Sequence, residues 1–162
     1  MEINPYSAPT ADLNVAATTS DDLISDNFRR FSAWWVFLLS IVTLRIYTVY
    51  WIIINARTLN RIQSNPIAPI WLLLMVIFLA SSYVLEYAFP QMEWAIAATN
   101  IAYLVTLLTS LFKVKNRLQD LMTESTSSPS NLSSVLTFLF DAIYLQYKIN
   151  EHIDHNRPTV DK

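Results

Sequence analysis

Two long uncharged runs dominate the hydrophobic pattern of this chain. They cover residues 67–85 and 94–112, roughly twenty residues each, and the turn between them carries Glu86, Pro90 and Glu93. A helix rises about 1.5 Å per residue, so each run is long enough to cross the ~30 Å hydrocarbon layer of a bilayer. The pattern therefore predicts two antiparallel transmembrane helices joined as a hairpin.

A shorter apolar run lies on each side of this hairpin. The first covers about fourteen residues, 31–44, and the last covers about sixteen residues around Asp141. Their lengths are more typical of re-entrant or interfacial segments than of full spans. The predicted fold is an all-α polytopic membrane protein with a central hairpin flanked by two short helical segments. Full crossing by residues 31–54 and 132–150 remains the alternative.

The two ends of the chain are expected to lie outside the helical unit. Residues 1–25 are polar and small, without a helical or strand period, and residues 156–162 are polar. We expect a disordered arm over 1–25, a single helical membrane domain over 26–155 and a solvated tail. No signal peptide is expected before Asp26, because a basic stretch followed by an apolar one is missing there.

The positions of the basic residues favour one topology. If all four segments crossed the bilayer, the lysines and arginines outside them would be divided five against five. If only the hairpin crosses, all ten lie on one side, and the positive-inside rule prefers this arrangement. We therefore predict a multi-pass protein of the cell membrane with both termini in the cytoplasm.

Composition excludes several classes of function. The chain is 53% hydrophobic and 15% charged with a net charge of −2, so nucleic acid is not an expected partner. It has no cysteine and no glycine, which rules out thiolate metal sites and the glycine-dependent motifs of many enzymes. The only two histidines, His152 and His155, are too few for a histidine metal site and stand in no triad-like context. We expect no cofactor, no metal and no enzymatic activity.

Small residues recur at every fourth position of the second long run, at Ala98, Ala102, Thr106 and Ser110. Such a stripe lets a second helix approach closely, so it is the predicted site of helix packing. The partner is either the first helix of the hairpin, near residues 80–82, or a second copy of the protein. A chance arrangement of common membrane residues is the alternative.

Three polar residues, Arg45, Asn100 and Asp141, interrupt the apolar segments. Asn100 is expected to form an interhelical hydrogen bond rather than to bind a ligand. Arg45 and Asp141 either line a polar pathway or reach the headgroup region, and the second interpretation is favoured. They stand ten and nine residues before Asn55 and Asn150, which suggests a diverged repeat.

Residues 43–51, T-L-R-I-Y-T-V-Y-W, resemble the T-L-G-I-Y-x-x-Y-W signature of a bacterial family of small integral membrane proteins of unknown function. Residues 144–150, Y-L-Q-Y-K-I-N, resemble that family's closing segment. The resemblance brackets most of residues 31–152 and implies a membrane location, with no catalytic residue to carry over. It departs at Arg45, where the family pattern has glycine. Arginine lacks glycine's freedom at positive φ, so a sharp turn is not expected there.

Two functions remain open. The first is a non-enzymatic protein of the lipid bilayer that packs against itself or another membrane protein through the small-residue stripe. The second is an oligomeric channel or transporter component that uses Arg45 and Asp141 in a polar pathway.

Overall fold

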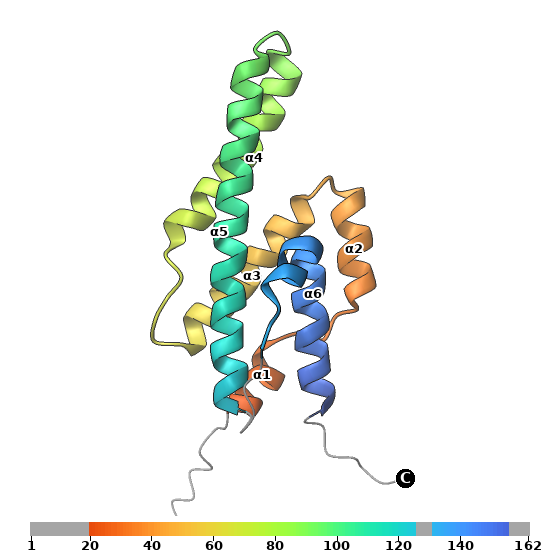
Figure 1. Ribbon diagram of the computed structural model, residues 1–162, viewed down its shortest axis with the longest axis vertical. Coiled ribbons are helices and arrows are strands. Elements are labelled where there is room, and N and C mark those ends of the chain that lie inside the picture. Colours follow the sequence, from red (N-terminus) through yellow and green to blue (C-terminus); the bar gives the residue numbers. More distant parts are fainter. Residues whose placement is uncertain (1–19, 126–130, 156–162) are drawn as a thin grey trace, which may run out of the picture.

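The computed structural model describes residues 20–125 and 131–155. Its helices are α1 (Ser20–Asn27), α2 (Ala33–Val42), α3 (Ile46–Ile62), α4 (Pro69–Ala88), α5 (Glu93–Ser125) and α6 (Ser134–His155). No strand occurs in these two ranges, so the predicted all-α class is confirmed. Figure 1 shows α4 and α5 as an antiparallel hairpin whose closed end extends beyond every other helix.

The hairpin of α4 and α5 is the predicted one. Both helices are long and apolar enough to cross a membrane, and shorter helices flank them. Pro69 begins α4, a position where its missing N–H costs no helical hydrogen bond. Only 17% of the most apolar stretch of α4 and 28% of that of α5 are buried, whereas the core helix of a soluble protein is mostly buried. The apolar side chains of the hairpin therefore mostly face outward.

The second half of α5 leaves the hairpin and joins a bundle with α1 and with parts of α3 and α6 (Figure 1). We call this unit, residues 20–28, 51–62, 111–125 and 142–155, the basal bundle. Along α5 its core is formed by a stripe of buried residues with helical spacing. These residues are Leu111, Val114, Leu118 and Leu121. One continuous helix thus links the hairpin to the basal bundle.

Part of the predicted N-terminal arm is helical. Helix α1 begins at Ser20, so the prediction of a disordered arm is corrected for residues 20–25. Residues 1–19 and the predicted tail lie outside the described residues. Ile24 and Phe28 are buried where α1 packs on α5 and α6. So short a helix is stabilised by tertiary packing rather than by its own period, which is why the sequence pattern does not reveal it.

A sharp reversal joins α2 to α3 at Leu44 and Arg45. Their φ angles are 49° and 71°, so an arginine takes the left-handed conformation that glycine favours. The Tyr83 hydroxyl donates a 2.6 Å hydrogen bond to the Leu44 carbonyl, and the Thr43 hydroxyl accepts one of 3.0 Å from the Tyr47 N–H. The expectation that arginine would disfavour a sharp turn is therefore wrong, because these bonds hold the turn.

Replacing Arg45 with glycine is expected to stabilise the fold by about 1 kcal/mol, because the left-handed conformation costs a non-glycine residue roughly 1–2 kcal/mol. Arg57→Gly is the matched control. Arg57 is exposed within α3, where glycine should cost about 1 kcal/mol of helix propensity. Thermal melting in detergent should rise for the first variant and fall for the second. A fall for both would show that the turn is not strained.

Helix α6 is broken at Asp141, where φ is 51° and ψ is −134°. Its first piece begins at Ser134, and the Ser133 hydroxyl accepts a 3.3 Å hydrogen bond from the Leu136 N–H. The break precedes the sequence Ile-Tyr-x-x-Tyr at residues 143–147, and the same sequence follows the α2–α3 turn at residues 46–50. Both segments of the predicted repeat therefore leave the helical conformation, at a residue with positive φ, shortly before this sequence.

Aromatic side chains mark both ends of the hairpin. Tyr87 and Trp94 are 93% and 75% exposed beside the closed end. At the other end, the Lys113 ammonium lies 5.4 Å from the centre of the Trp71 ring. Trp71 and Tyr87 are sixteen residues apart on α4, which is about 24 Å along a helix. Aromatic residues at such a spacing are typical of the two interfaces of a bilayer.

Candidate functional site

A pocket of about 430 Å³ lies between the α2–α3 turn and the hairpin, and its lining combines three leucines with several polar residues. We call it the polar pocket. It brings together two residues that the sequence singled out, Arg45 and Asn100. The Asn100 amide on α5 donates a 3.3 Å hydrogen bond to the Glu86 carboxylate on α4, which is an interhelical bond of the predicted kind. Ser82, Tyr83 and Tyr103 contribute hydroxyl groups to the same lining.

The pocket lies about halfway along the apolar part of the hairpin. Tyr103 stands ten residues after Glu93 and ten before Lys113, or about 15 Å from each along α5. Because Arg45 lines the same pocket as Tyr103, the tip of the α2–α3 turn reaches this depth as well. The Tyr103 hydroxyl is buried, and within the described residues it has no hydrogen-bond partner. The pocket thus offers a cation, a carboxylate, an amide and hydroxyl groups to a polar solute.

Asp141 lies near this pocket but does not line it. The carboxylate interacts electrostatically with the Arg45 guanidinium, yet the ion pairs between described residues do not include one between them. One Asp141 oxygen is buried without a hydrogen-bond partner in the described chain. The structure therefore brings Arg45 and Asp141 within electrostatic reach rather than into contact. Their use in a polar pathway stays a prediction.

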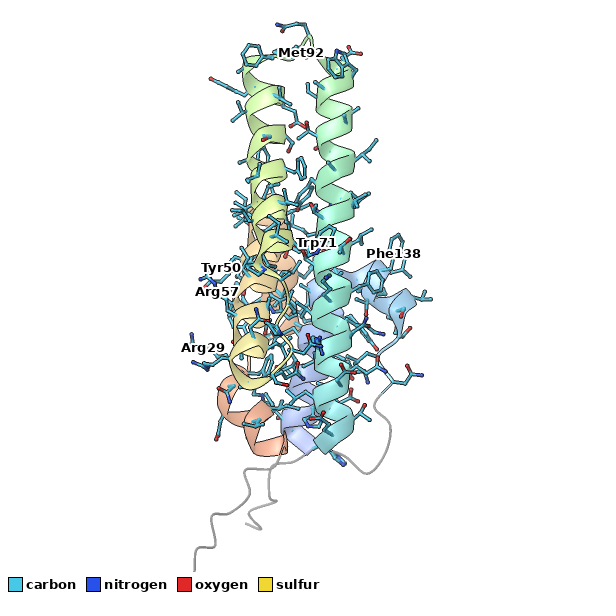
Figure 2. The ribbon with its side chains drawn as sticks, turned by 90° about the vertical axis from the view of Figure 1, so that its left-hand side faces the viewer. Arg29, Tyr50, Arg57, Trp71, Met92 and Phe138 are labelled. Atoms are coloured by element: carbon cyan, nitrogen blue, oxygen red, sulfur yellow. The ribbon has the colours of Figure 1, made fainter. Side chains whose placement is uncertain are left out.

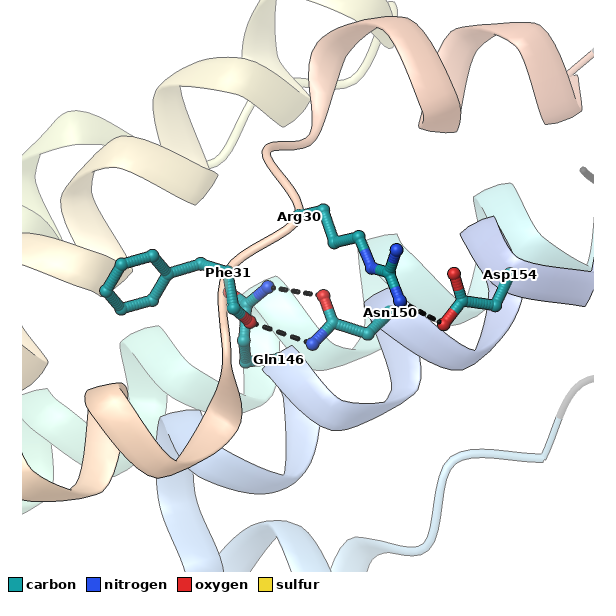
Figure 3. Close-up of polar contacts among 5 residues, drawn as sticks. All are labelled: Arg30, Phe31, Gln146, Asn150 and Asp154. Carbon is teal, nitrogen blue, oxygen red and sulfur yellow. Dashed lines mark hydrogen bonds and ion pairs between the residues drawn. The ribbon is translucent and has the colours of Figure 1, made fainter.

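Gln146 on α6 connects three segments of the chain. Its side-chain oxygen accepts a 2.8 Å hydrogen bond from the Trp51 indole on α3. Its amide donates to the Arg29 carbonyl at 3.3 Å and to the Asn150 side-chain oxygen at 3.1 Å. Asn150 in turn donates a 2.8 Å bond to the Phe31 carbonyl, as Figure 3 shows. We call Trp51, Gln146, Asn150 and these two carbonyls the Gln146 network. This network fixes α3, α6 and the segment before α2 relative to one another.

Exposed ion pairs surround the Gln146 network. Arg30 and Asp154 are 2.9 Å apart (Figure 3) and link the chain before α2 to the end of α6. Lys148 donates a hydrogen bond to Glu151, and this bond raises the pKa of Lys148. Such exposed pairs contribute about 0–1 kcal/mol each, so they orient the helix ends more than they stabilise them. His152 and His155 lie in the same last turns of α6, and within the described ranges no group of histidines and acids suits a metal ion.

The small-residue stripe on α5 is covered at one end only. Thr106 and Ser110 are buried, Ala102 is half-buried and Ala98 is exposed. The Thr106 hydroxyl donates within its own helix, to the Ala102 carbonyl at 2.9 Å. Toward the basal bundle the stripe is therefore occupied by the protein's own helices, while its outer end is open. Its role as a site of helix packing stays a prediction.

Replacing Ala102 with leucine is expected to destabilise the protein by about 1–3 kcal/mol, since overpacking forces neighbouring helices apart. Ala97→Leu is the matched control, because Ala97 is exposed on another face of α5. The midpoints of thermal unfolding in one detergent give the comparison. Equal midpoints for the two variants would mean that the stripe is not an interface.

Several residues of these two sites are absent from the sequence-based candidates. Gln146 is a polar residue on a buried face that includes Ala142, Leu145 and Ile149. A lone polar residue at core spacing is a usable signal. Tyr103 and Glu86 give no such signal. Their meeting with Arg45 depends on contacts between segments far apart in the chain.

The fold is that of an all-helical protein with two candidate membrane-spanning helices, flanked by shorter helices. The model of a domain of unknown function, DUF4234, matches residues 31–120, and the chain belongs to this family. The matched range includes residues 43–51 but ends before residues 144–150, and the T-L-G-I-Y signature itself stays a prediction. No curated protein and no solved structure matched the chain.

Proposed function

We propose that the protein is a non-enzymatic integral membrane protein that crosses the bilayer twice and acts by packing against a second copy or another membrane protein. The observation that carries the proposal is the outward-facing apolar surface of the hairpin, whose apolar stretches are mostly unburied. Exposed apolar surface of this extent marks a protein or membrane contact. The aromatic residues at both ends of α4 support a location in the membrane.

The basic residues support an orientation in which the basal bundle lies in the cytoplasm. Figure 2 shows Tyr50, Trp71 and Phe138 at a similar height, Met92 at the far end of the hairpin, and Arg57 and Arg29 on the other side of that level. The described lysines and arginines other than Arg45 flank this level or lie in the basal bundle, and residues 86–93 contain none. By the positive-inside rule this distribution favours a cytoplasmic basal bundle, and the proposal puts both termini on the same side.

The open end of the small-residue stripe supports the choice of a helix as partner. Ala98 is exposed on the part of α5 that extends past α2, α3 and α6. In lipid, helices associate through close backbone packing and hydrogen bonds, which small residues permit. A transmembrane helix of a partner could therefore lie against this part of α5.

The second candidate function is an oligomeric channel or transporter component. The polar pocket at half depth favours it, since Arg45, Glu86 and Asn100 line a space large enough for a small solute. Broken helices that reach the middle of a bilayer also build the sites of many transporters. In this case Arg45 and Asp141 would contribute to the pathway.

Affinity purification of the intact protein from mild detergent tests the two candidates. A membrane protein recovered in fixed stoichiometry, or a homodimer that Ala98→Leu disrupts, supports the packing function. The matched substitution Ala97→Leu should leave either complex intact. Suppose instead that the protein purifies as a homogeneous oligomer, that liposomes containing it show ion flux, and that Arg45→Gln abolishes this flux. That result would contradict the packing function and support the channel or transporter function.

A further inference from the structure

The two ends of the hairpin differ greatly in how many helices surround them. Near the closed end, α4 and α5 stand alone (Figure 1). Closer to the basal bundle, α3 and α6 contact the hairpin, and α2 lies on their outer side, in contact with both. The cross-section of the molecule is therefore wide at one end of the apolar layer and narrow at the other.

The added helices carry exposed apolar side chains. Val36 is the only buried residue of α2. Trp34, at its base, is 71% exposed, and Val42, at its tip, is 77% exposed. On the first piece of α6, Phe138 and Leu139 are also exposed, and Figure 2 shows Phe138 at the height of Trp71. Neither surface is covered by another part of the described chain.

Helix α2 spans half of the apolar layer. Its ten residues measure about 15 Å, against ~30 Å for the hydrocarbon of a bilayer. The turn after it carries Arg45 into the pocket beside Tyr103, midway between Glu93 and Lys113. The exposed surface of α2 thus runs from the interface to the middle of the bilayer and no further.

The acyl chains of the leaflet next to the basal bundle are the occupant that fits these surfaces. The exposed apolar side chains of α4, including Leu73 and Val76, are available to the same acyl chains. Arg29 and Arg30 stand just before α2, where they meet the headgroups of the same leaflet. No comparable apolar helix is placed beside the closed end of the hairpin in the described chain.

We propose that the protein acts as a wedge in this single leaflet and concentrates on membrane that is convex toward the basal bundle. Each helix is about 10 Å wide, so α2, the start of α3 and the first piece of α6 enlarge one leaflet only. The added helices give this leaflet a larger area than the other one. Bending of the membrane toward the other leaflet relieves this difference in area, and interfacial helices are sensitive to curvature for the same reason. This inference rests on the membrane placement proposed above.

The test uses the full chain in mixed vesicles of zwitterionic and anionic phospholipid. The chain has no cysteine, so Arg57→Cys gives one label, and an impermeant fluorescent maleimide reports only molecules whose basal bundle faces outward. Label density per membrane area is then measured on single vesicles of different size. A curvature-sensitive insertion should give a higher label density on the smallest vesicles than on the largest. Equal density would overturn the wedge.

Charged variants assign the effect to α2. Ile41→Glu with Val42→Glu makes immersion of the α2 tip unfavourable, so enrichment should fall toward one while the hairpin remains inserted. Asn116→Glu with Thr123→Glu is the control, since both positions are exposed on α5 in the basal bundle; it should keep the enrichment. If the α2 variant does not fold, Phe138→Ala with Phe140→Ala should lower the enrichment in part.

The outcomes separate the two proposals. Release of the wild-type protein from vesicles by alkaline carbonate would contradict the membrane placement itself. Retention with equal density on all vesicle sizes would contradict the wedge alone. Retained enrichment in both the α2 and the α6 variants would also overturn it.

Discussion

Replacing Leu118 with alanine is expected to lower the free energy of unfolding by about 2–5 kcal/mol, because a large cavity opens in a packed core. Leu118 is 0% exposed in the second half of α5, where the basal bundle closes around that helix. Unfolding in one detergent, followed by circular dichroism, measures the change.

Leu73→Ala is the matched control for this prediction. The substitution is chemically identical, but Leu73 is 56% exposed on α4 and is expected to face lipid. Acyl chains or detergent can fill the space that its side chain leaves, so the stability should change little. An equal loss in both variants would contradict the view that the basal bundle has a protein core and the hairpin a lipid-facing surface.

Replacing Gln146 with leucine is expected to destabilise the protein by about 1–3 kcal/mol for each buried group that loses its partner. The buried Trp51 indole loses its partner in this variant, and the partly buried Arg29 carbonyl loses one as well. Leucine is close to glutamine in size, so the loss comes mainly from hydrogen bonding rather than from packing. Thermal unfolding of the purified variant provides the measurement.

A double-mutant cycle with Trp51→Phe isolates the bond between the two side chains. Phenylalanine removes the indole donor, so the second substitution should cost less once the first is made. We expect the two losses to fall short of additivity by about 0.5–3 kcal/mol. Strict additivity would mean that the 2.8 Å contact between Trp51 and Gln146 contributes nothing to stability.

The hairpin could be predicted from the sequence because its signal is local. Uncharged runs of sufficient length between Pro69 and Phe112, with breakers at the turn, define α4 and α5 without knowledge of any other segment. The sequence also indicates that α5 continues beyond Lys113, since Leu111, Val114 and Leu118 lie on one helical face. In both cases the hydrophobic period and length carry the information.

The turn at Arg45 and the break at Asp141 could not be predicted in the same way. A positive φ at a residue other than glycine needs outside support, and the Tyr83 hydroxyl that binds the Leu44 carbonyl is 39 residues away in the chain. The sequence around Asp141 predicts a continuous helix that contains one polar residue. The break occurs where α6 packs against α2 and α5, which are distant in the chain.

The candidate sites follow the same division. Arg45, Asn100 and Asp141 stand out in the sequence as polar residues in apolar segments, yet the pocket depends equally on Glu86 and Tyr103. The Gln146 network joins groups more than ninety residues apart. Only the folded chain shows which of these polar groups share a site.

The central claim is that only α4 and α5 cross the membrane, with all other described helices on the side of the basal bundle. Single cysteines in this cysteine-free chain test it most directly, at Arg57, Glu93 and Asn116, which are exposed in the structure. On intact cells an impermeant thiol reagent should label position 93 alone, and positions 57 and 116 should react only after permeabilisation. Labelling of position 57 from outside would contradict the account.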